Sequence, residues 1–197
     1  MDRSWVHKKN GFTLIELLAG VLISAIILAG MYSVFFSQQT AFSAQEQVAE
    51  MNQNIRAALD LMTREIRLAG YKTSTSAFTG IATATSNSIR ILADLNQDGD
   101  TADDNEDISY TYNAGALQIC RNGISPPTPE PVADNITGIS FQYTLKDGTV
   151  TSAPASPADI RKITISITAR TTRPDQGTGM YRSISLSSDI TLRNLAS

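Results

Sequence analysis

Residues Lys8-Lys-Asn-Gly-Phe-Thr-Leu-Ile-Glu16 begin an apolar run that continues to Phe36. The order is a basic flank, a glycine, an aromatic residue and then a single acid at the start of the apolar stretch. From Leu17 to Phe36 no side chain is charged. About 20 apolar residues are enough for a helix to span a bilayer. The stretch therefore predicts a membrane-spanning helix. A simple membrane anchor gives no reason for an acidic residue at position 16.

The charges on either side of the run predict its orientation. Arg3, Lys8 and Lys9 precede it, and no charged residue follows until Glu46. Because basic residues stay on the cytoplasmic side of a membrane, we expect the amino terminus inside and the rest of the chain outside. A secretory signal would be cut after the apolar region at small residues spaced A-x-A. No such site lies just past Phe36, so we expect the apolar segment to be retained.

The nonamer from Lys8 to Glu16 resembles the processing site of type IV prepilins. The resemblance implies cleavage after Gly11 by a prepilin peptidase and methylation of the new amino terminus on Phe12. It also makes Glu16 the fifth residue of the mature chain, with a role in subunit assembly. Its expected partner is the methylated amine of Phe12 on a neighbouring pilin subunit. The alternative is an ordinary signal anchor, in which Glu16 only interacts with the helix dipole.

A helix is expected to continue far beyond the membrane. There is no proline before Pro126, and the first natural terminator after the apolar run is Gly70. A helix from Phe12 to Ala69 would be roughly 85 Å long, whereas a bilayer core takes about 30 Å. In the outer half, apolar residues recur at steps of three and four: Val48, Met51, Ile55, Ala58, Leu59, Met62, Ile66 and Ala69. This stripe predicts packing on the chain's own sheet, with Arg56, Asp60 and Arg64 facing solvent.

The polar stretch from Ser37 to Gln47 lies between the two halves of that helix. Its composition predicts a looser, partly unwound neck.

After Thr73 the apolar period changes from 3.6 to 2, which predicts half-solvated antiparallel strands. The alternating residues are Ile89 and Ile91; Ile108, Tyr110 and Tyr112; Leu117 and Ile119; Ile139, Phe141, Tyr143 and Leu145; Ile163, Ile165 and Ile167; and Ile184, Leu186, Ile190 and Leu192. Hairpin turns are expected at Asn113-Ala-Gly115 and Lys146-Asp-Gly148. Loops are expected at Ser125–Pro131, Ser152–Pro157 and Thr172–Gly179.

The expected fold class is therefore α+β, with a long amino-terminal helix packed on an antiparallel β-sheet domain. The expected segments are a cleaved leader over residues 1–11 and a transmembrane and assembly helix over 12–36. An exposed continuation of the helix follows over 37–70, and the β domain occupies 71–197.

Two further stretches sharpen the resemblance. Arg64-Glu-Ile-Arg-Leu-Ala-Gly-Tyr71 and Leu192-Arg-Asn-Leu195 look like the corresponding parts of PilW-type minor pilins, and J-type pseudopilins of type II secretion share the layout. The resemblance implies a structural subunit that waits in the inner membrane with its carboxyl-terminal domain outside the cytoplasm, and then joins a pilus filament.

Composition argues against several other functions. The net charge is −3 and the first eleven residues carry +2, which leaves −5 and no basic cluster for nucleic acid. The single cysteine, Cys120, excludes an intrachain disulfide. The single histidine, His7, lies in the expected leader, so Ser-His and Cys-His dyads and histidine zinc sites are absent from the mature sequence. We therefore expect no enzyme and no required cofactor.

One acidic stretch suggests calcium. Asp94-Leu-Asn-Gln-Asp-Gly-Asp100 is followed by four more carboxylates up to Asp107. Oxygen ligands at alternate positions with glycine at the sixth resemble an EF-hand loop, in which Asp94, Asn96, Asp98 and Asp100 would be the ligands. The pattern departs at the twelfth position, where Asn105 replaces glutamate and Glu106 comes one residue late. The alternative is a solvated acidic hairpin without metal.

A function of another class follows from the same loop. The chain could act as a membrane-anchored, calcium-dependent binding module that never polymerises.

Overall fold

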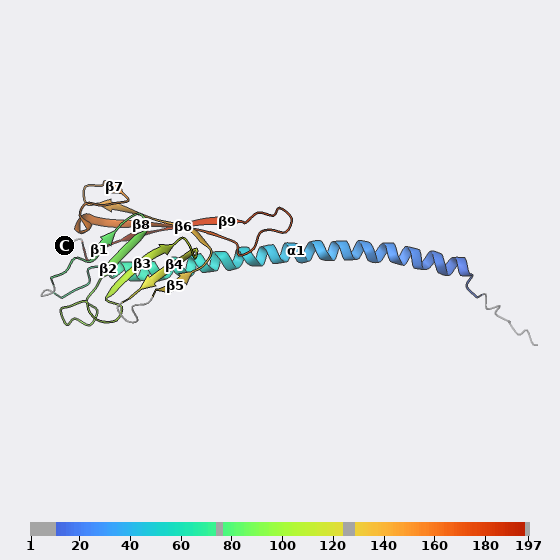
Figure 1. Ribbon diagram of the computed structural model, residues 1–197, viewed down its shortest axis with the longest axis horizontal. Coiled ribbons are helices and arrows are strands. Elements are labelled where there is room, and N and C mark those ends of the chain that lie inside the picture. Colours follow the sequence, from blue (N-terminus) through green and yellow to red (C-terminus); the bar gives the residue numbers. More distant parts are fainter. Residues whose placement is uncertain (1–10, 74–76, 124–128, 196–197) are drawn as a thin grey trace, which may run out of the picture. The chain divides into compact units, whose positions relative to one another are not determined.

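The computed structural model describes residues 11–73, 77–123 and 129–195. The rest of the expected leader, including His7, and residues 125–128 of the expected loop at Ser125–Pro131 lie outside these ranges. The chain divides into two compact units, Met1–Gln45 and Glu46–Ser197. Within the described residues there is one α-helix, α1 (Leu14–Arg67), which continues from the first unit into the second (Figure 1).

Helix α1 confirms the predicted helix but not the predicted neck. Residues 37–47 are helical throughout, so the expectation of a partly unwound segment is wrong. The physical reason is that this stretch contains neither glycine nor proline; its alanine and glutamine residues favour a helix, and its serine and threonine residues lower helix stability only modestly. Thr40 donates its hydroxyl back to the carbonyl oxygen of Phe36 at 2.9 Å, which also fits a regular helix.

The helix ends where the sequence predicts. Gly70 adopts a φ of +77°, the left-handed conformation that a glycine takes at low cost after a helix. Its amide donates to the carbonyl oxygen of Leu92 at 2.9 Å, so the end of the helix is joined directly to a strand.

The second unit contains two antiparallel sheets. The first has the order β1-β2-β3-β4-β5, with β1 (Ile81–Ala84), β2 (Ser88–Leu92), β3 (Asp107–Asn113), β4 (Gln118–Asn122) and β5 (Glu130–Ala133). The second has the order β7-β6-β8-β9, with β6 (Ile136–Leu145), β7 (Val150–Thr151), β8 (Ile160–Arg170) and β9 (Ser183–Thr191). A short 3-10 turn, η1 (Pro157–Asp159), precedes β8. In Figure 1 the first sheet runs from green to yellow and the second from orange to red.

Most strands were predicted by the sequence, and the exceptions are short. The alternating residues lie in or beside β2, β3, β4, β6, β8 and β9, and both hairpin turns are confirmed. Strands β1, β5 and β7 were not predicted. Residues Glu130 and Pro131 belong to β5, not to a loop; a proline is tolerated there because β5 is an edge strand. The sequence predicted one sheet because periodicity identifies strands but not their partners.

The predicted stripe of α1 is confirmed as the centre of the core. Ile55, Met62 and Ile66 are fully buried, and together with side chains of both sheets they form one continuous apolar cluster. On the opposite side of the helix, Arg64 pairs with Asp60 at 2.8 Å in solvent, as the i, i+4 spacing predicts. The single cysteine, Cys120, is a buried free thiol.

Glu65 adds polar contacts between α1 and the first sheet. Its carboxylate accepts a hydrogen bond from the Tyr110 hydroxyl at 2.5 Å and pairs with the Nε atom of Arg121 at 3.0 Å. Burial, and then the hydrogen bond to Glu65, raise the pKa of Tyr110 far above its ordinary value. Burial also raises the pKa of Tyr143 in β6, whose hydroxyl donates at 2.8 Å to the carbonyl oxygen of Thr85, between β1 and β2.

The first prediction is that the folded chain loses stability as the pH rises above about 10, the ordinary pKa of tyrosine. A raised pKa in the folded state means that unfolding releases a proton, so the stabilisation is complete below pH 10 and declines above it. Tyr110→Phe should reduce the slope of the unfolding free energy against pH by about 1.4 kcal/mol per pH unit in this range. Denaturant titrations of both forms at several alkaline pH values measure the slope, and equal slopes would contradict the prediction.

The second prediction concerns the contact between Gly70 and Gly80. A Cβ atom at Gly80 would lie 2.2 Å from the Gly70 nitrogen and 2.4 Å from its Cα, a clash with backbone that no rotamer relieves. Gly80→Ala should therefore destabilise the unit by about 1–3 kcal/mol. The control is Gly138→Ala, where the added atom meets nothing within 4 Å and the change should be within about 0.5 kcal/mol. Thermal melts of the full chain in detergent that shift equally for both variants would disprove the steric explanation.

Candidate functional site

The three residues expected to act in processing and assembly lie at or just before the start of α1. Gly11 and Phe12 lie just ahead of the helix and are exposed. Thr13 is the residue before Leu14, and its carbonyl oxygen accepts the first helical hydrogen bond, from the Leu17 amide, at 3.2 Å. Gly11, Phe12 and Glu16 are thus gathered at the amino-terminal end of the helix.

Glu16 forms a capping box with Thr13. Its Oε2 atom accepts the Thr13 amide at 2.9 Å and the Thr13 hydroxyl at 2.8 Å, and its own amide donates to the Thr13 Oγ1 atom at 3.3 Å. Such reciprocal bonds satisfy amides that a helix start leaves open. The sequence interpretation missed Thr13, although the T-x-x-E spacing is the known signal for this cap.

The same face of the helix carries small residues. Glu16, Gly20 and Ser24 follow at steps of four and share a shallow groove that Phe12 also lines. The Ser24 hydroxyl donates to the Gly20 carbonyl oxygen at 2.8 Å, so its polar group is satisfied within the helix. A face of this kind lets a second helix approach closely in lipid.

The large apolar side chains from Leu14 to Phe36 are all exposed. Among the described residues, α1 is the one helix that is long and apolar enough to cross a membrane. An exposed apolar surface of this extent requires a membrane or other subunits to cover it.

The acidic loop, residues 94–106, connects β2 to β3. Its ends are held by backbone hydrogen bonds: the Ala93 amide donates to the Glu106 carbonyl oxygen, and the Asp94 amide donates to the Tyr71 carbonyl oxygen, both at 2.8 Å. Inside the loop, Asn96 and Asp98 each accept the amide two residues further on, at 3.0 and 3.1 Å. The loop is therefore ordered by many short-range hydrogen bonds.

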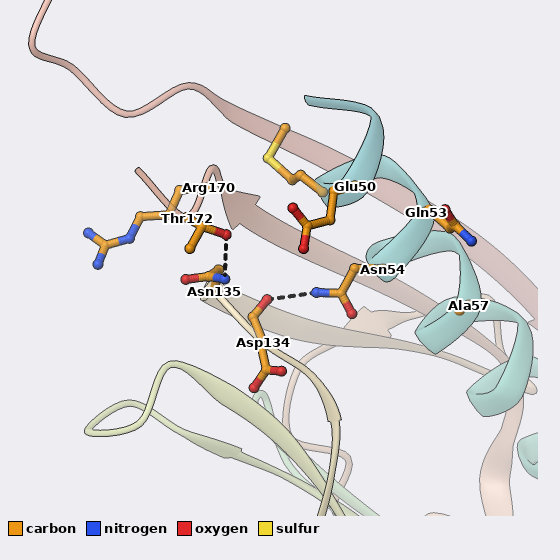
Figure 2. Close-up of a pocket in the computed structure, with 9 residues that line it drawn as sticks. Glu50, Gln53, Asn54, Ala57, Asp134, Asn135, Arg170 and Thr172 are labelled. Carbon is orange, nitrogen blue, oxygen red and sulfur yellow. Dashed lines mark hydrogen bonds between the residues drawn. The ribbon is translucent and has the colours of Figure 1, made fainter. Parts of the chain in front are cut away.

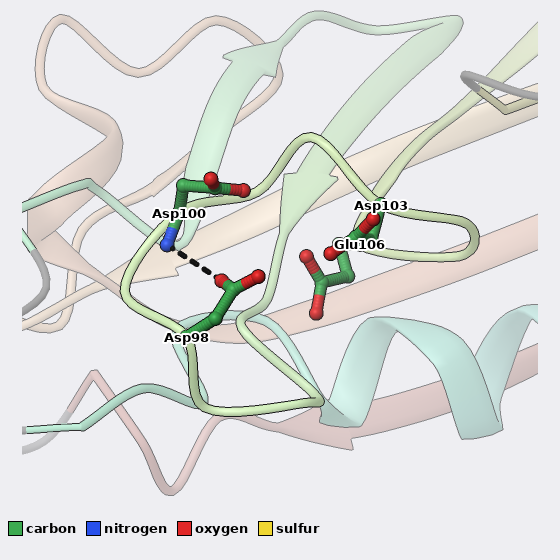
Figure 3. Close-up of side chains that lie close together, drawn as sticks. All are labelled: Asp98, Asp100, Asp103 and Glu106. Atoms are coloured by element: carbon green, nitrogen blue, oxygen red, sulfur yellow. Dashed lines mark hydrogen bonds between the residues drawn. The ribbon is translucent and has the colours of Figure 1, made fainter.

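The structure gathers four carboxylates in this loop, and they are not the four ligands predicted from the sequence. Asp98, Asp100, Asp103 and Glu106 each place one oxygen within 4.8 Å of the others (Figure 3). Of the predicted ligands, Asp98 and Asp100 are in this group and Asp94 and Asn96 are not. Asp94 is fully buried and accepts the Gly99 amide at 3.2 Å.

Asn96 acts as a donor within the loop. Its Nδ2 atom donates to Asp98 at 2.9 Å and to Asp103 at 2.6 Å. It thereby holds two of the carboxylates together.

Glu106 could have been found from its position in the strand pattern. It stands two and four residues before Ile108 and Tyr110, and all three are buried, so period 2 places this acid on the inward face. Its Oε1 atom accepts the amides of Leu95 and Asn96 at 2.7 and 3.1 Å. Counting the EF-hand positions left Glu106 out of the predicted ligands, because the twelfth position falls on Asn105 and Glu106 comes one residue late.

Two pKa shifts reflect how close these carboxyl groups are. The Asp100 amide, which donates to Asp98, lowers the pKa of Asp98. The neighbouring carboxyl group of Asp98 raises the pKa of Asp103.

The loop is also tied to the core. The Arg121 guanidinium donates to the Oδ1 atom of Asn105 at 2.7 Å and, through Nε, to Glu65 on α1. Asn105 itself has a φ of +68°, which turns the chain so that Glu106 points inward.

A polar groove beside α1 is another candidate for a site in the second unit. Figure 2 shows its lining, in which the Asn54 amide donates to the Asp134 carbonyl oxygen at 2.9 Å and the Asn135 amide donates to Thr172 at 3.3 Å. The Asp134 carboxylate accepts the Gln118 amide at 2.7 Å. These hydrogen bonds hold four of the lining residues in place, and none of them joins a nucleophile to a general base.

Comparison with known families decides the class of protein. Residues 44–188 match the family described as prepilin peptidase-dependent protein B. The chain belongs to this family. Residues 6–32 match the prokaryotic N-terminal methylation motif. The two matches together show that the chain is a type IV pilin-like protein. Membership in this family favours a structural role over catalysis.

Among solved structures, a type IV-like pilin from Thermus thermophilus is similar, with 13% identity over 74% of this chain and 98% of that chain and a TM-score of 0.47. None of the curated proteins matches the sequence.

Proposed function

We propose that this member of the family is a minor pilin of the PilW type, a structural subunit of a type IV pilus. A prepilin peptidase would remove the leader after Gly11, and Phe12 would then carry a methylated amine. The subunit would wait in the inner membrane with its sheet unit outside the cytoplasm, and would then join other pilin subunits in the filament.

The observation that carries this proposal is the position of Glu16 on an exposed apolar helix. A carboxylate inside a membrane is costly and usually needs a partner. Thr13 occupies only one of the Glu16 oxygens, because its amide and its hydroxyl both donate to Oε2. The other oxygen can therefore accept the amine of Phe12 from a neighbouring subunit. Gly20 and Ser24 on the same face would let that neighbour approach.

The closest alternative is a J-type pseudopilin of type II secretion, which would use the same helix in a different machine. Deletion of the gene separates the two: loss of surface pili with normal protein secretion supports the minor pilin, and the reverse supports the pseudopilin. A membrane-anchored module that never polymerises would be absent from sheared filaments.

The third prediction concerns processing. In cells with the matching peptidase, the mature protein should begin at Phe12 and carry one methyl group on its amine. Gly11→Leu should keep the leader attached, because a site that accepts glycine has no room for a branched side chain. Gly30→Leu is the control, since the same change at an open position should leave cleavage intact. Mass spectrometry of the amino-terminal peptide measures both, and a wild-type terminus at Met1 or beyond Phe36 would refute the proposed cleavage.

The fourth prediction separates the charge of Glu16 from its cap. Glu16→Gln keeps an acceptor for the Thr13 amide, since glutamine also serves in a capping box, but removes the charge. It should insert into the membrane like the wild type yet be recruited into filaments about tenfold less, equivalent to about 1.4 kcal/mol. Thr13→Ala, which removes the cap and keeps the charge, should be recruited nearly normally.

Quantitative blots of sheared filaments against membrane fractions measure this recruitment. If Glu16→Gln matched the wild type while Thr13→Ala was depleted, Glu16 would act only as a helix cap.

A further inference from the structure

We propose that the acidic loop binds one calcium ion through the carboxylates of Asp98, Asp100, Asp103 and Glu106. This goes beyond the proposed function, because it concerns the sheet unit and holds for a pilus or a secretion subunit alike. It also differs from the sequence pattern, which selected Asp94 and Asn96 in place of Asp103 and Glu106.

The spacing of the four oxygens fits a calcium ion. They lie within 4.8 Å of one another. Calcium binds oxygen at about 2.3–2.6 Å, so two ligands on opposite sides of the ion are about 4.6–5.2 Å apart. One ion can therefore contact all four side chains with little movement of the backbone.

The independent observation is the state of the Glu106 side chain. It is only 2% exposed, and its Oε2 atom is buried without a hydrogen-bond partner anywhere in the described part of the chain. Its other oxygen is fixed by the amides of Leu95 and Asn96. Figure 3 shows this carboxylate facing Asp98 and Asp103.

Leaving a carboxylate oxygen buried and unsatisfied is costly, whereas a bound cation satisfies it directly. The buried, unsatisfied oxygen of Glu106 therefore favours a bound cation. A group of exposed acids would give no such argument.

The donor set favours calcium over other metals. Four carboxylates with no sulfur or imidazole suit a hard cation and not zinc or copper. Magnesium demands near-ideal octahedral geometry and usually keeps several of its waters, whereas calcium accepts 6–8 oxygens in flexible geometry. Four side chains from a short loop, completed by water, match calcium better. Sites in extracellular modules bind calcium at about 10⁻⁴–10⁻³ M, so millimolar calcium should fill this one.

The loop's contacts predict what binding would do. Through Asn105, Arg121 and Glu65 the loop is joined to the buried face of α1, and through Asp94 it is joined to the residue that follows the helix end. An ion that fixes the loop should therefore stabilise the whole sheet unit and not only the turn. Binding to the folded state alone raises the melting temperature with ligand concentration.

The fifth prediction is tested with the full chain in detergent, after removal of divalent ions with a chelator. Calorimetric titration with calcium chloride should show one site. The melting temperature should rise by about 3–6 °C at tenfold excess over Kd, and much less with magnesium chloride. Asp98→Asn combined with Asp103→Asn should weaken binding at least tenfold, and so should Glu106→Gln. The paired change affects exposed side chains, so it leaves the proposal testable even if Glu106→Gln misfolds.

The matched control is Asp104→Asn, which removes the same charge from the same loop outside the four carboxylates. It should keep calcium affinity within about twofold of the wild type. Superimposable melts in calcium and in chelator would overturn the proposal and leave a solvated acidic turn. So would an equal loss of affinity in Asp104→Asn, which would indicate diffuse attraction, or equal binding of magnesium.

Discussion

The sheet unit depends on the burial of one stripe of helix α1. Ile55, Met62 and Ile66 are fully buried among side chains that come from both sheets, so neither sheet has a complete core without the helix. Apolar burial is worth about 25 cal/mol per Å² and is the main favourable term in folding. The helix therefore supplies the part of the core that both sheets contact. Gly70 and Gly80 allow the end of the helix to lie directly against the first sheet.

Two acids show how the same side chain acquires different roles from its surroundings. Glu16 lies on an exposed helix face, where a cap satisfies one oxygen and the other remains open to another subunit. Glu106 lies on the inward face of a strand start, where two amides fix one oxygen and nothing in the described chain satisfies the other. In both places one carboxylate oxygen is left without a partner in the chain, and we propose a neighbouring amine for the first and a cation for the second.

The sequence was a good guide wherever the pattern was local. The stripe of α1, the helix end at Gly70, the solvent pair Asp60–Arg64 and the six longer strands all follow from apolar period and turn residues. It was a poor guide in the neck and in the short strands. The neck was expected to unwind because it is polar, yet polarity without glycine or proline does not end a helix. The short strands carry too few residues for a period and exist because a neighbour supplies their hydrogen bonds.

The sequence alone determined the class of this protein. Gly11, Phe12, Glu16 and the apolar run lie close together along the chain, so their pattern can be recognised without the tertiary structure. Tertiary structure decided which carboxylates meet. Asp103 and Glu106 join Asp98 and Asp100 because Asn105 takes a positive φ, and because Arg121 and Glu65, far away in the chain, hold that turn in place. Local spacing can predict that acids are near one another along the chain. Only the backbone turn and the contacts from distant residues determine which of their oxygens share one point in space.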